Sequence, residues 1–153
     1  MEEQPVILKE EPKKKKSALR IIIEWVIYLA ILVGLVWGTP KILAKVLNTQ
    51  YPIATVTSGS MWPALKQGDL IFVKGVLGKN DIKVGDIVIY KNERGFTIHR
   101  LVRMNENTFV TKGDANNVED AAAGYDKLVG KTLRLGKNPL RIPYLGKIST
   151  LIR

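Results

Sequence analysis

The distribution of hydrophobic positions along the chain changes once, near residue 50. Between residues 18 and 38 nearly every position is apolar, and only Arg20 and Glu24 carry charge. A helix of about twenty such residues, with a rise of about 1.5 Å each, spans a hydrocarbon core of about 30 Å. The pattern therefore predicts a transmembrane helix over residues 18–38, in which Arg20 and Glu24 share one helix face and form an ion pair.

A cleavable signal sequence is the alternative interpretation of this apolar segment. The run is longer than the apolar core of a typical signal sequence, and no Ala-x-Ala cleavage site follows it. The lysine block at residues 13–16 outweighs Lys41 and Lys45 on the other side, which by the positive-inside rule places the N-terminus in the cytosol. We therefore expect a single-pass protein of the cell membrane, with its main domain on the outer or luminal side.

The segments that flank the predicted helix show no apolar period. Residues 1–17 combine glutamates, prolines and the lysine block, which is the composition of a flexible cytosolic tail. After the helix, Pro40 is expected to kink or end it, so that residues 39–50 form a juxtamembrane linker in which residues 41–47 can continue as a short interfacial turn. The exterior domain is therefore expected to cover residues 51–153.

Beyond residue 50 the hydrophobic pattern is that of short strands. Runs rich in β-branched and aromatic residues recur about every ten residues and are separated by Gly, Asn and Asp. The predicted strands cover residues 53–57, 70–73, 86–90, 97–104 and 108–111. Residues 118–124 carry the single suggestion of a helical turn. This pattern predicts a mainly β domain with a partly closed antiparallel sheet.

The net charge of +10 raises the possibility of a nucleic-acid partner. The distribution of charge argues against it, because the lysine block at residues 13–16 adjoins the apolar segment and the other basic residues alternate with acidic ones. Attraction to anionic lipid headgroups explains the excess more simply, so we expect membrane lipid and no nucleic acid among the partners. The absence of cysteine excludes a disulfide framework, a zinc–thiolate site and a cysteine nucleophile.

The segment 57–65, with the sequence TSGSMWPAL, follows a predicted strand. Its simplest interpretation is a turn, since Ser, Gly and Pro are ordinary turn residues. A turn alone does not account for Met61 and Trp62, which we expect to face the membrane interface or the substrate. A serine after glycine at a sharp turn can present its hydroxyl to a substrate and its N–H to a developing oxyanion. These properties make Ser60 a candidate nucleophile and Ser58 a candidate second oxyanion donor.

This segment resembles the nucleophile motif S-G-S-M-x-P of the type I signal peptidase family. The matching positions are Ser58, Gly59, Ser60, Met61 and Pro63. In that family the second serine is the nucleophile, which implies this role for Ser60. The first serine contributes to the oxyanion hole in the bacterial branch, which implies that role for Ser58.

His99 is the single histidine of the chain and lies in a predicted strand. A lone histidine in a strand is, taken alone, more often structural than catalytic. Bacterial signal peptidases use a lysine base, whereas the archaeal and endoplasmic-reticulum-type branch uses a histidine in a strand motif that resembles Ile98, His99 and Arg100 here. The resemblance therefore implies that His99 is the general base, as a serine nucleophile requires.

The segment 111–120, with the sequence TKGDANNVED, resembles a third motif of the histidine branch, in which a second aspartate follows the first by six residues. The matching positions are Gly113, Asp114, Asn117 and Asp120. Ala115 stands where the family usually has asparagine. The resemblance implies that Asp120 orients His99 and that Asp114 supports the loop, with the exchanged assignment left open. The other interpretation is a cluster of Asx turns without a catalytic role.

The resemblance implies a small β-rich domain of the signal-peptidase type behind one membrane helix. Its expected activity is that of a membrane-anchored serine endopeptidase, which removes signal peptides from exported preproteins after small residues. It implies neither a metal nor an organic cofactor, and its expected partners are preprotein signal peptides and membrane lipid. Two alternatives remain open: a related membrane-bound processing peptidase with another class of substrate, and a non-catalytic membrane-tethered β subunit.

Overall fold

The structure is a computed structural model that describes residues 17–93 and 95–146. The chain divides into two compact units, whose boundary falls between Gly38 and Thr39. One long helix, α1 (Ala18–Val46), begins in the first unit. Its most apolar window has a mean hydropathy of 2.3, so the helix is long and apolar enough to cross a membrane.

The two charged residues inside the apolar segment are paired as predicted. Arg20 Nε lies 3.8 Å from Glu24 Oε1, one helical turn away. An ion pair at this spacing offsets part of the cost of placing either charge near an apolar environment. The helix can therefore carry both charges without interrupting its apolar length.

The end of α1 differs from the prediction. A linker was expected from residue 39, but the helix continues through Pro40 as far as Val46. A proline removes one N–H donor from the helical ladder, and the ladder resumes beyond it, with Leu47 N donating to Leu43 O at 2.8 Å. The residues after Pro40, KILAKV, include good helix formers, which explains why the helix does not stop.

The second unit consists of short strands. They are β1 (Ile53–Thr55), β2 (Leu70–Gly75), β3 (Ile87–Asn92), β4 (Gly95–Met104), β5 (Thr108–Lys112), β6 (Ala123–Gly124), β7 (Leu128–Thr132), β8 (Arg134–Leu135), β9 (Asn138–Pro139) and β10 (Arg141–Ile142). Short 3-10 helices cover Lys79–Asp81 and Tyr125–Lys127. All five strands predicted from the sequence are present, with ends shifted by a few residues.

The helical turn predicted at residues 118–124 is wrong. Strand β6 lies in this segment, and the nearest helical turn comes directly after it, at Tyr125–Lys127. Ala123 pairs with Phe109 of β5 and is buried in the core. Packing against the sheet therefore overrides the helix propensity of the alanine run.

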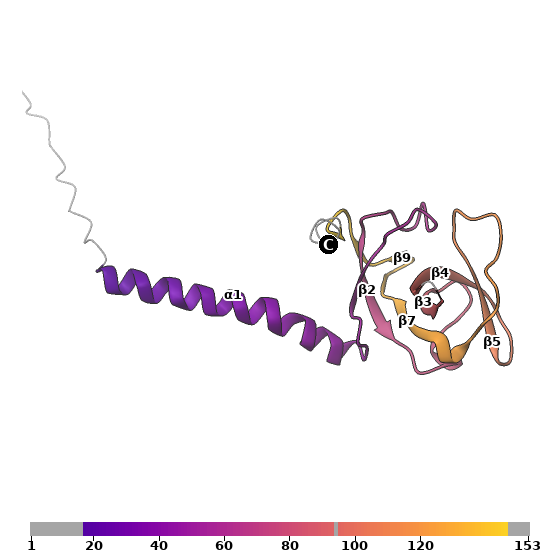
Figure 1. The fold of residues 1–153 in the computed structure, drawn as a ribbon, viewed down its shortest axis with the longest axis horizontal. Helices are drawn as coiled ribbons and strands as arrows, with labels where there is room; N and C mark the ends of the chain where they lie inside the picture. The colour runs from indigo at the N-terminus through magenta and orange to yellow at the C-terminus, as the bar shows by residue number, and fades with distance from the viewer. Residues whose placement is uncertain (1–16, 94, 147–153) are drawn as a thin grey trace, which may run out of the picture. The chain divides into compact units, whose positions relative to one another are not determined.

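The sheet is antiparallel, strongly curled and open. Its strands follow the order β1-β2-β7-β3-β4-β5-β6, and β10 also pairs with β2. Figure 1 shows β2 and β5 on opposite sides of β3 and β4, with β7 between β2 and β3. Among the described residues β1 and β6 stand at the two ends of this path, so the sheet does not close into a barrel.

Two cores lie on the two faces of the sheet, and alternate residues of β3 contribute to both. Ile87 and Ile89 pack into one core, whereas Val88 and Tyr90 pack into the other. The first core also contains Val56, Met61, Leu65, Ile71 and Val73. The second also contains Ile82, Leu101, Phe109 and Ala123. Because side chains alternate along a strand, this arrangement places neighbouring residues of β4 in different surroundings.

Candidate active site

The turn that carries Ser60 follows β1 and is anchored by buried side chains. Trp62 N donates to Gly59 O at 3.0 Å, and Leu65 N donates to Met61 O at 2.9 Å. Met61 and Leu65 are buried in the first core, which fixes the base of the turn. The hydroxyl of Ser60 is consequently held above this core, at the surface of the domain.

A second loop holds the backbone of Ser60 from the other side. Ala115 N donates to Ser60 O at 2.8 Å, and Asn116 N closes the loop by donating to Gly113 O at 3.0 Å. A Cβ atom added at Gly113 would lie 2.7 Å from Ser60 O and equally close to the amide nitrogen of Asn116. Glycine at this position therefore permits the close approach of the two loops.

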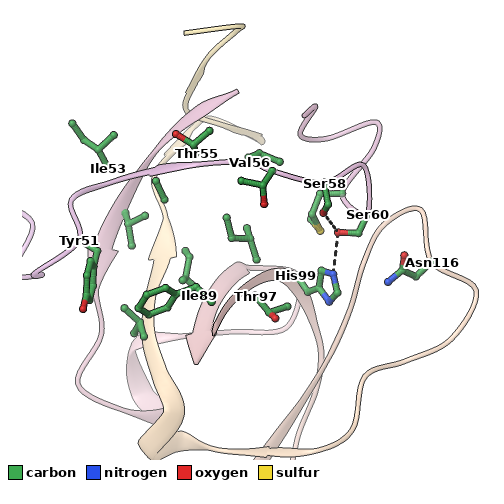
Figure 2. Close-up of a pocket in the computed structure, with 17 residues that line it drawn as sticks. Tyr51, Ile53, Thr55, Val56, Ser58, Ser60, Ile89, Thr97, His99 and Asn116 are labelled. Carbon is green, nitrogen blue, oxygen red and sulfur yellow. Dashed lines mark hydrogen bonds between the residues drawn. The ribbon is translucent and has the colours of Figure 1, made fainter. Parts of the chain in front are cut away.

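His99 connects the two loops through its imidazole ring. It lies on β4 opposite Val88 of β3, and it is buried. Its Nε2 lies 3.1 Å from Ser60 Oγ, and its Nδ1 lies 2.5 Å from Asp120 Oδ2. Figure 2 shows the ring directed at the Ser60 hydroxyl. Serine, histidine and aspartate thus form one continuous chain of hydrogen bonds.

Asp120 accepts hydrogen bonds from more than the histidine. Thr111 Oγ1 donates to Asp120 Oδ2 at 2.6 Å, and the Tyr90 hydroxyl donates to the same oxygen at 3.3 Å. The main chain supports this position as well, because Asp120 N donates to Thr111 O at 2.8 Å. Burial, followed by the negative charge of Asp120, raises the pKa of Tyr90 above its ordinary value, which keeps the phenol protonated and able to donate.

Asp114 lies near the same loop but does not contact His99. Its two carboxylate oxygens accept hydrogen bonds from Arg100 Nε and Nη2 at 2.7 and 2.6 Å. Arg100 Nη1 donates in addition to Gly85 O at 2.9 Å. The hydrogen bonds that Arg100 donates to Asp114 raise the pKa of Arg100. This fork-like pair ties the loop of residues 113–116 to β4 on the face opposite His99.

Ser58 stands beside Ser60. The two hydroxyl oxygens lie 3.1 Å apart, within hydrogen-bond distance (Figure 2). Ser58 is exposed, and both serines line the same groove. The Ser58 hydroxyl therefore lies within reach of a group bound at Ser60.

Met61 and Trp62 differ in burial. Both were predicted to face the membrane or the substrate. Trp62 is 59% exposed, whereas Met61 is only 1% exposed and packs in the first core. The prediction that Met61 enters a membrane interface is therefore wrong, because the first core encloses Met61. One side of Met61 lines the groove beside Ser60.

A groove of about 720 Å³ leads to the Ser60 hydroxyl. Its walls are β1 with the turn that follows it and the Phe96–His99 part of β4. Figure 2 shows Tyr51 at one end of the groove and Ser60 and His99 at the other. Among the described residues, strand β5 pairs only with the Arg100–Met104 part of β4. It therefore does not pair with the Phe96–His99 part, which lines the groove.

The structure brings together four of the residues that the sequence singled out. They are Ser58, Ser60, His99 and Asp120. It separates Asp114 from them and places it on the opposite face of β4. Sequence reasoning missed Thr111 and Tyr90. The available signal was the alternation of side chains along strands, which puts Tyr90, His99 and Thr111 on one face of three neighbouring strands.

Comparison with known proteins assigns the family. A family model described as Peptidase S24-like matches residues 38–127. The chain is 37% identical over 121 residues to the signal peptidase complex catalytic subunit SEC11 of Scheffersomyces stipitis, covering 73% of this chain and 72% of the relative.

Proteins of other organisms are similar as well. The signal peptidase complex catalytic subunit SEC11C of Pongo abelii is 32% identical over 148 residues, which covers 90% of this chain and 76% of the relative. The SEC11 subunit of Lodderomyces elongisporus is 38% identical over 122 residues. These matches cover both the serine turn and the histidine strand. The chain therefore belongs to the signal peptidase family, in its endoplasmic-reticulum-type branch.

Proposed function

We propose that this chain is a membrane-anchored serine endopeptidase that removes signal peptides from exported preproteins. In this proposal Ser60 is the nucleophile, His99 the general base, and Asp120 the carboxylate that orients His99. The observation that carries it is the continuous chain of hydrogen bonds from Ser60 Oγ through the imidazole to Asp120 Oδ2, at the end of an open groove. The names of the relatives, which are catalytic subunits of a signal peptidase complex, support the same activity.

The hydrogen bonds define the protonation states needed for attack. A carboxylate only accepts, so His99 Nδ1 carries a proton toward Asp120, and in a neutral imidazole Nε2 is then free to accept the Ser60 proton. Ser60 Oγ attacks the substrate carbonyl carbon as its proton passes to Nε2. Asp120 stabilises the imidazolium that forms, without becoming protonated itself.

Collapse of the tetrahedral intermediate completes the first half of the reaction. His99 Nε2 returns its proton to the leaving amine, the peptide bond breaks, and the signal peptide remains as an ester on Ser60 Oγ. A water molecule, deprotonated by His99, then attacks the ester and releases the carboxylate and the serine. The backbone N–H of Ser60 and the Ser58 hydroxyl are the donors we assign to the negatively charged oxygen.

The groove suits an extended peptide. β1 is an end strand of the sheet path, and the Phe96–His99 part of β4 forms the facing wall. A substrate strand that lies along these walls gains main-chain hydrogen bonds irrespective of its side chains. Val56 and Met61 are buried beside Ser60 and also line the groove, which leaves room there for a small side chain next to the cleaved bond.

The helix α1 supplies the membrane anchor in this proposal. Its length and hydropathy fit a single span, and the lysine block before it favours a cytosolic N-terminus. The peptidase domain then lies on the outer or luminal side, where the ends of signal peptides emerge. Resistance of the chain to carbonate extraction, and protection of a C-terminal tag from external protease in sealed vesicles, test the span and its orientation.

The decisive experiment is cleavage of one preprotein by the purified full-length chain in detergent, with sequencing of the new N-terminus. We expect the wild-type chain to cut after a small residue. Ser60→Ala and His99→Ala should both be inactive, because replacing one residue of an interdependent catalytic unit lowers the rate nearly as much as replacing all of them. Replacing the small residue before the cut by leucine provides the substrate control and should block cleavage. Near-normal cleavage by Ser60→Ala would contradict the proposal, and inactivity of wild type that is cured by added subunits would show that the chain acts only in a complex.

A further inference from the structure

Two buried hydroxyl groups behind the candidate site have no part in the reaction just described. Thr111 on β5 is 1% exposed and Tyr90 on β3 is 5% exposed. Both come from strands that flank β4, the strand of His99. Burying a hydroxyl group costs free energy unless it is hydrogen-bonded, so the partners of these two groups indicate what they do.

Both hydroxyl groups are directed at the carboxylate of Asp120. Thr111 Oγ1 lies 2.6 Å from Asp120 Oδ2, and the Tyr90 hydroxyl lies 3.3 Å from the same oxygen. The two hydroxyl groups also lie 3.2 Å from each other. The oxygen they contact is the one that accepts the proton of His99 Nδ1 at 2.5 Å. Three donors from three neighbouring strands therefore meet at a single carboxylate oxygen.

The Thr111 hydroxyl does not serve to hold the Asp120 backbone, because that task is done by the main chain. Asp120 N donates to Thr111 O at 2.8 Å, and this bond would survive loss of the side-chain hydroxyl. What the hydroxyl controls is rotation of the carboxylate about its Cβ–Cγ bond. With Thr111 and Tyr90 fixed in the core, Oδ2 is kept in line with the imidazole.

We propose that Thr111 is a positioning residue of the active site, assisted by Tyr90, and that it fixes the Asp120 carboxylate against His99. This inference rests on the proposed function, since it assigns Asp120 the task of orienting the base. Removing the Thr111 hydroxyl frees the carboxylate to rotate, and His99 then samples orientations in which Nε2 no longer faces Ser60. Misplacement of a catalytic group by about 1 Å can cost about 10²-fold in rate, which bounds the expected effect.

The test compares two buried threonines. Thr111→Val removes the hydroxyl with almost no change in shape, and Thr132→Val is the matched control. Thr132 is also buried, and its Oγ1 has no hydrogen-bond partner within the described residues. We expect Thr111→Val to lower kcat about 10- to 10²-fold with KM nearly unchanged. Thr111→Ser should restore most of the rate, and Tyr90→Phe should lower kcat by only about fivefold because its contact is longer.

A second readout does not depend on catalysis. The chain has a single histidine, so a ¹⁵N-histidine-labelled sample in detergent micelles gives the signal of His99 alone. We expect a downfield Nδ1–H proton resonance in wild type, Thr132→Val and Thr111→Ser, and its loss through exchange with water in Thr111→Val. An unchanged resonance and kcat in Thr111→Val, or equal losses in Thr111→Val and Thr132→Val, would overturn the inference. Cleavage by Ser60→Ala at the wild-type rate would overturn the proposed function instead. The His99 resonance does not depend on that result, so failure of the proposed function and failure of this inference are distinguishable.

Discussion

Adjacent residues of β4 make two carboxylate contacts of opposite kinds. His99 meets Asp120 through one ring nitrogen and leaves the other at 3.1 Å from Ser60 Oγ. Arg100 meets Asp114 with two nitrogens and uses the third on Gly85 O. The first contact keeps a proton-accepting atom available, whereas the second satisfies every nitrogen of the guanidinium. One face of this strand therefore leaves a ring nitrogen beside a hydroxyl group, and the other ties the loop of residues 113–116 to β4.

The largest effect should come from breaking the first contact. Asp120→Asn keeps the shape of the side chain but removes the charge that, in the proposed mechanism, selects the tautomer of the neutral His99 ring and stabilises its imidazolium. In a well-studied triad this change costs about 10⁴ in kcat, and we expect a loss of that order with little change in Tm. Single-turnover cleavage and calorimetry check the two parts separately. A stable Asp120→Asn variant with near-normal kcat would mean that the enzyme works as a serine–histidine dyad.

The next effect concerns the donor beside the nucleophile. Ser58→Ala removes a hydroxyl 3.1 Å from Ser60 Oγ and should lower kcat about 10²-fold if Ser58 binds the oxyanion. Ser58→Thr, which retains a hydroxyl, is the control and should keep most of the activity. If both variants cleave at the wild-type rate, Ser58 is only a turn residue.

A third variant tests whether the two faces of β4 are independent. Gly113 belongs to the loop of Asp114, yet a Cβ there would lie 2.7 Å from Ser60 O. Gly113→Ala should therefore push the Ser60 backbone away and lower kcat on the order of tenfold. The control is Gly78→Ala, because a Cβ at Gly78 meets nothing within 4 Å. Equal kcat values for the two alanine variants would show that the loop does not position the nucleophile.

The contact between Arg100 and Asp114 should matter for stability more than for chemistry. Asp114→Asn removes the charge that accepts two hydrogen bonds from Arg100 and should cost about 1 to 3 kcal/mol of unfolding free energy. Activity measured well below Tm should fall only a few-fold. Denaturant titration beside a kinetic assay separates the two. A stable but inactive Asp114→Asn variant, together with an unstable Asp120→Asn variant, would exchange the roles of the two aspartates.

The last prediction is that the stabilisation by the Arg100–Asp114 pair does not change with pH near neutrality. The pKa of Arg100 is raised by Asp114, so the stability gained from this pair is fully present below the pKa of an unfolded arginine and is lost only as pH rises through the folded value. The difference in Tm between wild type and Asp114→Asn should therefore stay the same from about pH 7 to about pH 10. A difference that shrinks within this range would mean that another titrating group carries the effect.

The sequence predicted the strands of the sheet because each run of β-branched and aromatic residues packs in one or both of the two cores. It also predicted that Ser60, His99 and Asp120 belong together, on family motifs that are far apart in the chain. The predictions for the end of the helix and for residues 118–124 were wrong for the same reason. In both segments a local preference, of proline to end a helix or of alanine to form one, is weaker than the surrounding structure.

Alternation along the strands gives the faces on which Tyr90 and Thr111 lie, but it does not predict that they meet at Asp120. Each looks like an ordinary strand residue, and their meeting at Asp120 depends on the pairing of β4 with β3 and β5. Alternation along a strand predicts which face a residue occupies, but not which strands are neighbours. The family motifs likewise do not show that Asp114 pairs with Arg100 while Asp120 contacts His99.

The groove beside Ser60 is bordered by β1, an end strand of the sheet. An exposed sheet edge can also pair with strands of other chains. Natural β proteins limit self-association through unpaired edge strands by keeping these strands short or by placing proline in them. β1 has only three residues, and Pro52, directly before it, has no N–H to offer a neighbour. The residues that line the groove thus also limit self-association of the domain through this edge.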